Sequence, residues 1–131
     1  MATCAPSANI ETQSHLGRAA LISLGENSGI GVNCRIQGSV TIGRNVMMGP
    51  DVVILSQNHL HHVGTVPFAE QGYMTAQVTI GDNVWIGARS IILPGVTIGS
   101  DCVVGAGTVV SKSIPPGTRV VGAAARMTDL L

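Results

Sequence analysis

Aliphatic residues recur every six positions along two long parts of this chain, and many are followed directly by glycine. The members are Leu24, Ile30, Ile36, Ile42, Met48 and Ile54, then Ile80, Ile86, Ile92, Ile98, Val104 and Val110. An α-helix would repeat every 3.6 residues and a simple strand every two, so this period indicates neither. It is typical of a parallel β-helix, in which short strands meet at corners and successive coils stack. We therefore predict an all-β chain folded as a three-sided column.

The extent of the repeat predicts how the chain is organised. Its positions, at three per coil, predict about four coils or more within a single domain spanning residues 1–131. Residues 1–20 lack the repeat, and we expect them to form an irregular cap. Pro115 and Pro116 then interrupt the pattern, because proline has no N–H to donate to a strand ladder. We expect residues 115–131 to form a short C-terminal tail that folds back along the column or ends in a short helix.

A segment is inserted between the two series, because the interval from Ile54 to Ile80 is not a multiple of six. It runs from about residue 57 to 77 and contains three of the four histidines, His59, His61 and His62. A long loop on an economical scaffold is more often functional than idle. A well-held imidazole can accept a proton from a hydroxyl at neutral pH. We predict an active-site loop; the alternative is that these are surface histidines on a mobile loop.

Composition and charge exclude several classes of function. The net charge is zero and aromatic residues make up 2% of the chain, so nucleic-acid binding has little support. We expect no membrane association and no secretory signal, because the chain has neither a long apolar run nor a charged leader followed by one. Cys34 and Cys102 fall at inward positions of the repeat. We interpret them as reduced core residues of a cytoplasmic protein, rather than as disulfide partners, metal ligands or nucleophiles.

Four further motifs carry a family resemblance: VWIG at 84–87, PGVTIG at 94–99, GAGTVVSKSIPP at 105–116 and VVGAAAR at 120–126. With the repeat and the loop, they resemble the hexapeptide-repeat acyltransferases over residues 24–127. Within that family the chain is most similar to the galactoside, maltose and capsular-polysaccharide O-acetyltransferases. The resemblance implies a left-handed β-helix, a homotrimer, and acetyl-CoA bound in the groove between adjacent columns. It also implies a small-molecule or saccharide acceptor.

The resemblance assigns roles to individual residues. The family's catalytic histidine closes a segment of the form IGxNVxxGPxVxxxxxxH, which matches residues 42–59 and places the general base at His59. His61 and His62 lie beyond that segment and receive no role. The implied cofactor-binding residues are Trp85, Ala88, Ala106, Ser111, Lys112 and Arg126. Lys112 and Arg126 suit the phosphates of CoA, although ordinary surface charge would also explain them, and Trp85 could instead be core filler.

These residues predict a direct transfer of the acetyl group from acetyl-CoA to a sugar hydroxyl, with no metal. A thioester is already activated, so a positioned base and an aligned acceptor suffice. We expect a backbone carbonyl to hold the second ring nitrogen of His59. Residues 34–39 contain no carboxylate at the position where galactoside enzymes bind their acceptor, so we expect a different acceptor.

Other activities are compatible with the same scaffold. They are N-acetylation of an amino sugar, O-acetylation of serine, a γ-type carbonic anhydrase-like metalloenzyme that uses the clustered histidines, and a non-catalytic scaffold.

Overall fold

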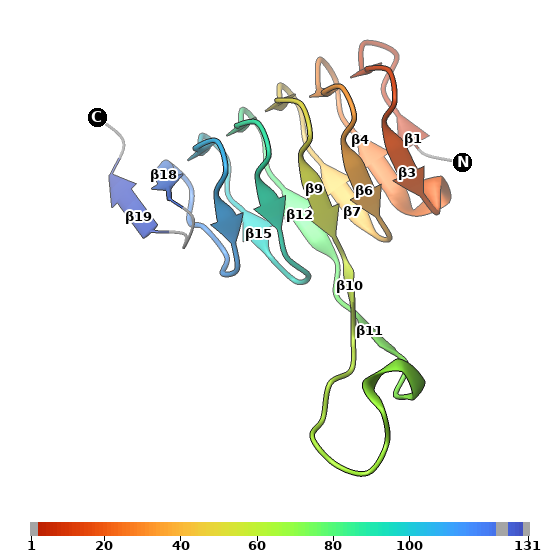
Figure 1. Ribbon diagram of the computed structural model, residues 1–131. Coiled ribbons are helices and arrows are strands. Elements are labelled where there is room, and N and C mark those ends of the chain that lie inside the picture. The colour runs from red at the N-terminus through yellow and green to blue at the C-terminus, as the bar shows by residue number, and fades with distance from the viewer. Residues whose placement is uncertain (1–2, 123–125, 130–131) are drawn as a thin grey trace.

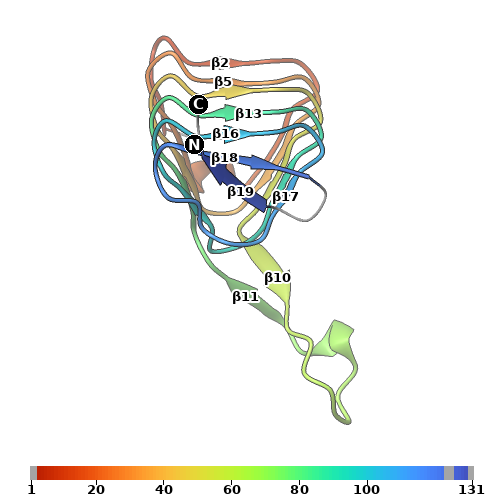
Figure 2. The same ribbon diagram turned by 90° about the vertical axis from the view of Figure 1, so that its left-hand side faces the viewer.

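The computed structural model describes residues 3–122 and 126–129 and shows a column of stacked coils with a long hairpin projecting from one edge (Figure 1). Viewed along its axis, the column is three-sided (Figure 2). Nearly all strand pairs are parallel, and the predicted left-handed parallel β-helix is confirmed. No helix in the described residues has the length and hydrophobicity needed to span a bilayer.

Each side of the column is one sheet, here named A, B and C in the order in which the chain visits them. Sheet A contains β1 (Thr3–Cys4), β4 (Ile22–Leu24), β7 (Val40–Ile42), β12 (Val78–Ile80) and β15 (Thr97–Ile98). Sheet B contains β2 (Asn9–Ile10), β5 (Gly29–Ile30), β8 (Met47–Met48), β13 (Trp85–Ile86), β16 (Val103–Val104), β18 (Thr118–Val121) and β19 (Arg126–Asp129). Sheet C contains β3 (His15–Gly17), β6 (Arg35–Gln37), β9 (Val53–Leu55), β14 (Ile91–Ile92) and β17 (Val109–Val110).

The six-residue repeat builds the core. Every aliphatic member of the two series is buried, and residues one coil apart stack directly, as Ile42 does on Ile80 and Ile86 on Val104. The column is filled by ladders of Ile and Val, which explains why the chain folds with so few aromatic residues. Cys34 and Cys102 are buried within these ladders and carry free thiols, as predicted for core residues.

Glycine follows the inward residue because neighbouring coils approach closely at the corners. A Cβ atom added to Gly87 would lie 2.5 Å from the backbone nitrogen of Ala106 in the next coil. Asparagine often occupies the corner positions that need a positive φ, such as Asn45 and Asn83 at 57° and 54°. Asparagine tolerates this left-handed conformation better than most side chains, so the repeat encodes both the core and the turns.

We predict that Gly87→Ala destabilises the column, because its new methyl group would meet backbone rather than a movable side chain. Forced overpacking of this kind lowers the free energy of unfolding by about 1–3 kcal/mol. Gly64→Ala is the matched control, since a Cβ there meets nothing within 4 Å. Denaturant unfolding of both variants provides the measurement, and equal midpoints for the two would contradict the close-approach explanation.

The N-terminal residues do not form the predicted irregular cap. Residues 3–17 form β1, β2 and β3, which add a complete coil in register, with Cys4, Ile10 and Leu16 paired to the inward residues of the next coil. The period of six is present here but is disguised by polar and small neighbours. It is then broken by a longer step between Leu16 and Leu24, which contains the short 3-10 helix η1 (Ala19–Leu21).

The C-terminal segment also differs from the prediction. After the proline pair, β18 joins sheet B parallel to β16, so the column continues for a further coil. The chain then turns back as predicted, but β19 is a strand antiparallel to β18 and not a helix. Sheet B therefore carries six parallel strands plus β19, and the column has about six coils, within the predicted "four or more". The shortened step from Val110 to Ile114, which bridges to Ile98, disguised this last coil in the sequence.

Candidate functional site

The inserted segment leaves the column at the edge between sheets C and A. It begins with β10 (Gln57–His59) directly after β9 and returns through β11 (Tyr73–Thr75) into β12. These two strands pair antiparallel, and the segment between them includes the 3-10 helix η2 (Phe68–Glu70). The hairpin extends well beyond the column in both views (Figures 1 and 2). The inserted segment, here called the arm, is thus a β-hairpin whose two strands pair where it joins the column.

His59 lies on the arm close to the column. It pairs in register with Tyr73, and the two rings lie 4.4 Å apart between centroids at an interplanar angle of 40°. The expectation that a carbonyl holds its ring nitrogen is not met: within the described chain neither ring nitrogen of His59 is hydrogen-bonded. Instead His61 Nδ1 lies 3.0 Å from the His59 carbonyl oxygen. The His59 side chain is exposed, and its ring packs against the exposed ring of Tyr73.

A pocket of about 230 Å³ adjoins His59 where the arm meets sheet C. Its walls are Gln37, Leu55, Gln57, Asn58, His59 and Tyr73. Three of these side chains are uncharged amides, which both donate and accept hydrogen bonds, and one is an aromatic ring. No carboxylate lines the pocket. Such a wall suits a neutral polyhydroxylated group that packs one face against an aromatic ring.

Trp85 belongs to a separate, apolar hollow on sheet B. Its side chain is 53% exposed and lies between Met47 and Val103 on the neighbouring strands. A cavity of about 370 Å³ follows the adjacent corner, with Trp85, Ala88 and Ala106 among its walls. The structure thus brings together three of the six residues that the sequence assigned to the cofactor. Their small or flat side chains leave room for an extended apolar chain.

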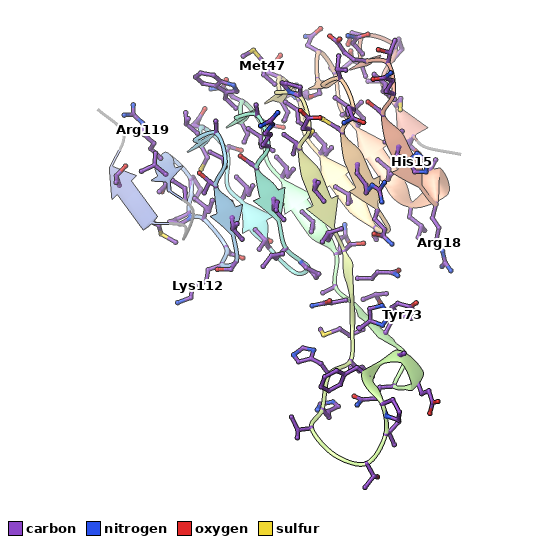
Figure 3. All side chains as sticks on the ribbon, viewed as in Figure 1. His15, Arg18, Met47, Tyr73, Lys112 and Arg119 are labelled. Atoms are coloured by element: carbon purple, nitrogen blue, oxygen red, sulfur yellow. The ribbon has the colours of Figure 1, made fainter. Side chains whose placement is uncertain are left out.

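Ser111 and Lys112 lie elsewhere. They follow β17 at the corner between sheets C and A, on the same edge as the arm, and both are exposed. Lys112 lies at the lower edge of the column, on the C-terminal side of the arm (Figure 3). Arg126 belongs to β19, but its side chain lies outside the described part of the structure.

The predicted site residues therefore form two sets on different parts of the column. His59, Ser111 and Lys112 follow the edge between sheets C and A, whereas Trp85, Ala88 and Ala106 face outward from sheet B and its far corner. Figure 2 shows the strands of sheet B on the opposite side of the column from the arm. The hollows at Trp85 and at His59 share no lining residue. Within one chain the two sets do not form a single pocket.

Sequence reasoning missed Tyr73 and Gln37. Tyr73 is the only tyrosine of the chain, which was a signal, but its partner depends on the register of the hairpin. Gln37 stands after an inward isoleucine, where most repeats have glycine, and this departure from the pattern marks it in retrospect.

The buried cysteines offer no nucleophile. Burial raises the pKa of the Cys34 thiol above its ordinary value, and Cys34 Sγ lies 3.2 Å from the carbonyl oxygen of Gly49. A thiol held protonated in this way is a poor nucleophile at neutral pH. Among the described residues, no three His, Cys, Asp or Glu side chains are placed to share a metal ion.

Comparisons with known proteins agree with this architecture. The model described as bacterial transferase hexapeptide (six repeats) matches residues 21–56, and that of the hexapeptide repeat of succinyl-transferase matches residues 77–112. Galactoside O-acetyltransferase of Escherichia coli K12 is 37% identical over 130 residues, which cover 96% of this chain. The crystal structure of a maltose O-acetyltransferase from Clostridium difficile 630 superposes with a TM-score of 0.87 at 35% identity, and the match covers 98% of this chain and 68% of that one.

A galactoside acetyltransferase in complex with coenzyme A also superposes with a TM-score of 0.87 at 35% identity, over 96% of this chain and 63% of that one. The chain spans 62% of the length of the Escherichia coli relative. The similarity thus extends over nearly all of this chain and over roughly two thirds of these relatives.

Proposed function

Because the chain belongs to the hexapeptide-repeat acyltransferase family, we propose that it transfers an acetyl group from acetyl-CoA to a saccharide hydroxyl, with His59 as the general base. The observation that carries this proposal is the His59 pocket, where an imidazole, three amides and a tyrosine ring surround a space of about 230 Å³. The relatives named for galactoside and maltose acetylation support a sugar acceptor. The relative bound to coenzyme A supports the donor.

The chemistry needs few groups. His59 removes the proton from the acceptor hydroxyl while that oxygen attacks the carbonyl carbon of the acetyl thioester. A C–O bond forms, the C–S bond breaks through a tetrahedral intermediate, and the CoA thiolate takes the proton back from the imidazolium. The ring of Tyr73 limits the rotation of His59, so the base is positioned before the acceptor arrives.

The donor is proposed to lie along the apolar hollow at Trp85, Ala88 and Ala106. This wall and His59 lie on different parts of one column, so a neighbouring copy has to supply one of them. A closed ring of identical subunits places the arm of each copy against sheet B of the next, with one site at every interface. We propose that this ring is the homotrimer that the family resemblance implies.

Lys112 is proposed to bind a phosphate of CoA, together with Ser111 and Arg126. We predict that Lys112→Gln raises the KM for acetyl-CoA about 10-fold, the loss expected for one charge-assisted hydrogen bond. Increasing salt should reduce the difference in the KM for acetyl-CoA between Lys112→Gln and the native protein. Arg44→Gln is the control, because Arg44 pairs with Asp82 at another corner of the column. An unchanged KM in Lys112→Gln would remove Lys112 from the donor site.

The proposed activity is tested by incubating the purified protein with acetyl-CoA and a panel of sugars while thiol release is followed. Acceptor-dependent release and an acetylated sugar of the corresponding mass are expected. An alkali-labile product indicates an ester, whereas a stable amide formed only from amino sugars would indicate N-acetylation instead. Release with serine alone would indicate serine O-acetylation. No acceptor-dependent release with any of these compounds would contradict the proposal and favour a non-catalytic scaffold.

A further inference from the structure

A second hollow, of about 130 Å³, adjoins the His59 pocket toward the N-terminal end of sheet C. It is lined by His15, Gly17, Arg35, Ile36 and Gln37. Gln37 lines both hollows, so they lie next to each other along sheet C, and together they are here called the trough. The proposed chemistry uses only the end of this trough that contains His59.

The register of three neighbouring strands builds the trough. His15 lies opposite Arg35, and Gly17 opposite Gln37, which in turn lies opposite Leu55. Gly17 has no side chain to fill the space beside Gln37, and a Cβ built there would have its nearest neighbour at 3.9 Å. The floor of the trough is therefore open beside Gln37 and Arg35, whose side chains can both donate hydrogen bonds.

The charge of the trough is positive and uncompensated. Arg35 is exposed, and no carboxylate lines either hollow. Arg44 and Arg89 have carboxylate partners, Asp82 at 4.0 Å and Asp51 at 3.7 Å, whereas no described carboxylate pairs with Arg35. Arg18 directly follows Gly17 and adds a second positive charge at this end (Figure 3).

Asp51 is a carboxylate near this ladder, two residues before Val53, which lies opposite Arg35. Its carboxylate already has two partners: Asn33 Nδ2 donates a hydrogen bond to Asp51 Oδ1 at 2.6 Å, and Arg89 Nε lies 3.7 Å from Asp51 Oδ2. Arg35 therefore retains its full hydrogen-bonding capacity toward a ligand, and its planar guanidinium suits an oxyanion with two acceptor oxygens.

We infer that the acceptor saccharide carries an oxyanion, a carboxylate or a phosphate, and that Arg35 with His15 binds it while His59 faces the hydroxyl to be acetylated. This inference rests on the proposed function and adds the class of acceptor to it. Arg35 and Gln37 are two residues apart on one strand, a separation of about 7 Å. A sugar residue seated over Gln37 thus places a charged substituent at Arg35 and a hydroxyl toward the arm.

The positions of the cations along this edge support the assignment. Lys112 lies on the C-terminal side of the arm, where the donor phosphates are proposed, whereas His15 and Arg18 lie on its N-terminal side (Figure 3). The arm thus separates two positively charged regions. One anionic reactant on each side would bring the two reacting groups together at His59.

The test compares matched neutral and anionic acceptors: glucose, glucuronic acid and glucose 6-phosphate. The native protein is expected to use at least one anionic sugar with a kcat/KM about 10–100-fold above that of glucose, the gain from a charge-assisted pair. Arg35→Gln should remove this preference by raising the KM for the anionic sugar, so that the ratio of the two kcat/KM values falls to about one. Arg44→Gln, on another corner, should retain it. A preference for glucuronic acid alone identifies a carboxylate, and for glucose 6-phosphate alone a phosphate.

Binding without turnover separates this inference from the proposed function. Glucuronic acid and glucose 6-phosphate are titrated into the His59→Ala protein by calorimetry, and again into His59→Ala with Arg35→Gln. Arg35-dependent binding, if the native protein transferred acetyl groups to no acceptor, would support the oxyanion site and refute the function. Equal use of neutral and anionic sugars, or an equal loss with both in Arg35→Gln, would overturn the inference and leave the function standing.

Discussion

Replacing His59 with alanine is expected to lower kcat by about 10²–10⁴-fold, the usual contribution of a positioned general base. The affinity for acetyl-CoA should stay within about twofold of the native value, because the donor is proposed to be held by the apolar hollow at Trp85 and by Lys112, and not by the His59 ring. Added imidazole should restore part of the rate by entering the space left beside Tyr73. Steady-state thiol release gives the rate, and calorimetry with CoA gives the affinity.

His62→Gln is the matched control for this experiment. His62 lies on the same arm, and it is its backbone N–H and carbonyl, not its ring, that hydrogen-bond Gln71. Its replacement should therefore leave kcat within about twofold, since no positioned base is removed. A full rate in His59→Ala, or an equal loss in both variants, would mean that His59 is not the base.

Replacing Ala106 with tryptophan is expected to weaken acetyl-CoA binding about 100-fold, which corresponds to about 3 kcal/mol. Ala106 is exposed at the corner after β16 and forms part of the wall of the 370 Å³ hollow. An indole at this position would occupy the space proposed for the donor while leaving the buried ladders untouched. Calorimetry with CoA and the KM for acetyl-CoA provide the measurement.

Thr12→Trp controls for the effect of an added indole. Thr12 occupies the equivalent corner of the N-terminal coil, where it is also exposed, and it does not line the 370 Å³ hollow. The Thr12→Trp protein should bind CoA with the native affinity and unfold at a similar denaturant concentration. If Ala106→Trp bound CoA normally, the hollow at Trp85 would not be the donor site.

The column was predictable because one short pattern determines both its core and its turns. Ile86 and Gly87 illustrate this: the first must be buried, and the second must let two coils touch. The terminal coils were missed because each contains a step of a different length. The inward residues Cys4 and Leu16 kept the period of six. A single repeat, however, does not indicate which later strands it will pair with.

The site was predictable only in part, for a related reason. His59 lies in a local motif and at the root of an obvious insertion, so it could be found along the chain. Tyr73 and Gln37 reach His59 through hairpin pairing and through stacking between coils, and both depend on a register that a single sequence does not state. The separation of Trp85 from His59 likewise follows from which side of the column each strand occupies.

The most direct test of a site shared between copies mixes these two impaired variants and assays them with acetyl-CoA well below the KM of Ala106→Trp. His59→Ala and Ala106→Trp are co-expressed in equal amounts, and all the randomly assembled oligomers are purified together. If the base comes from one copy and the donor wall from the next, about one quarter of all interfaces regain both native groups, whatever the size of the ring. The account predicts about a quarter of the native activity in the unfractionated mixture. Activity no higher than that of the two parents would contradict it.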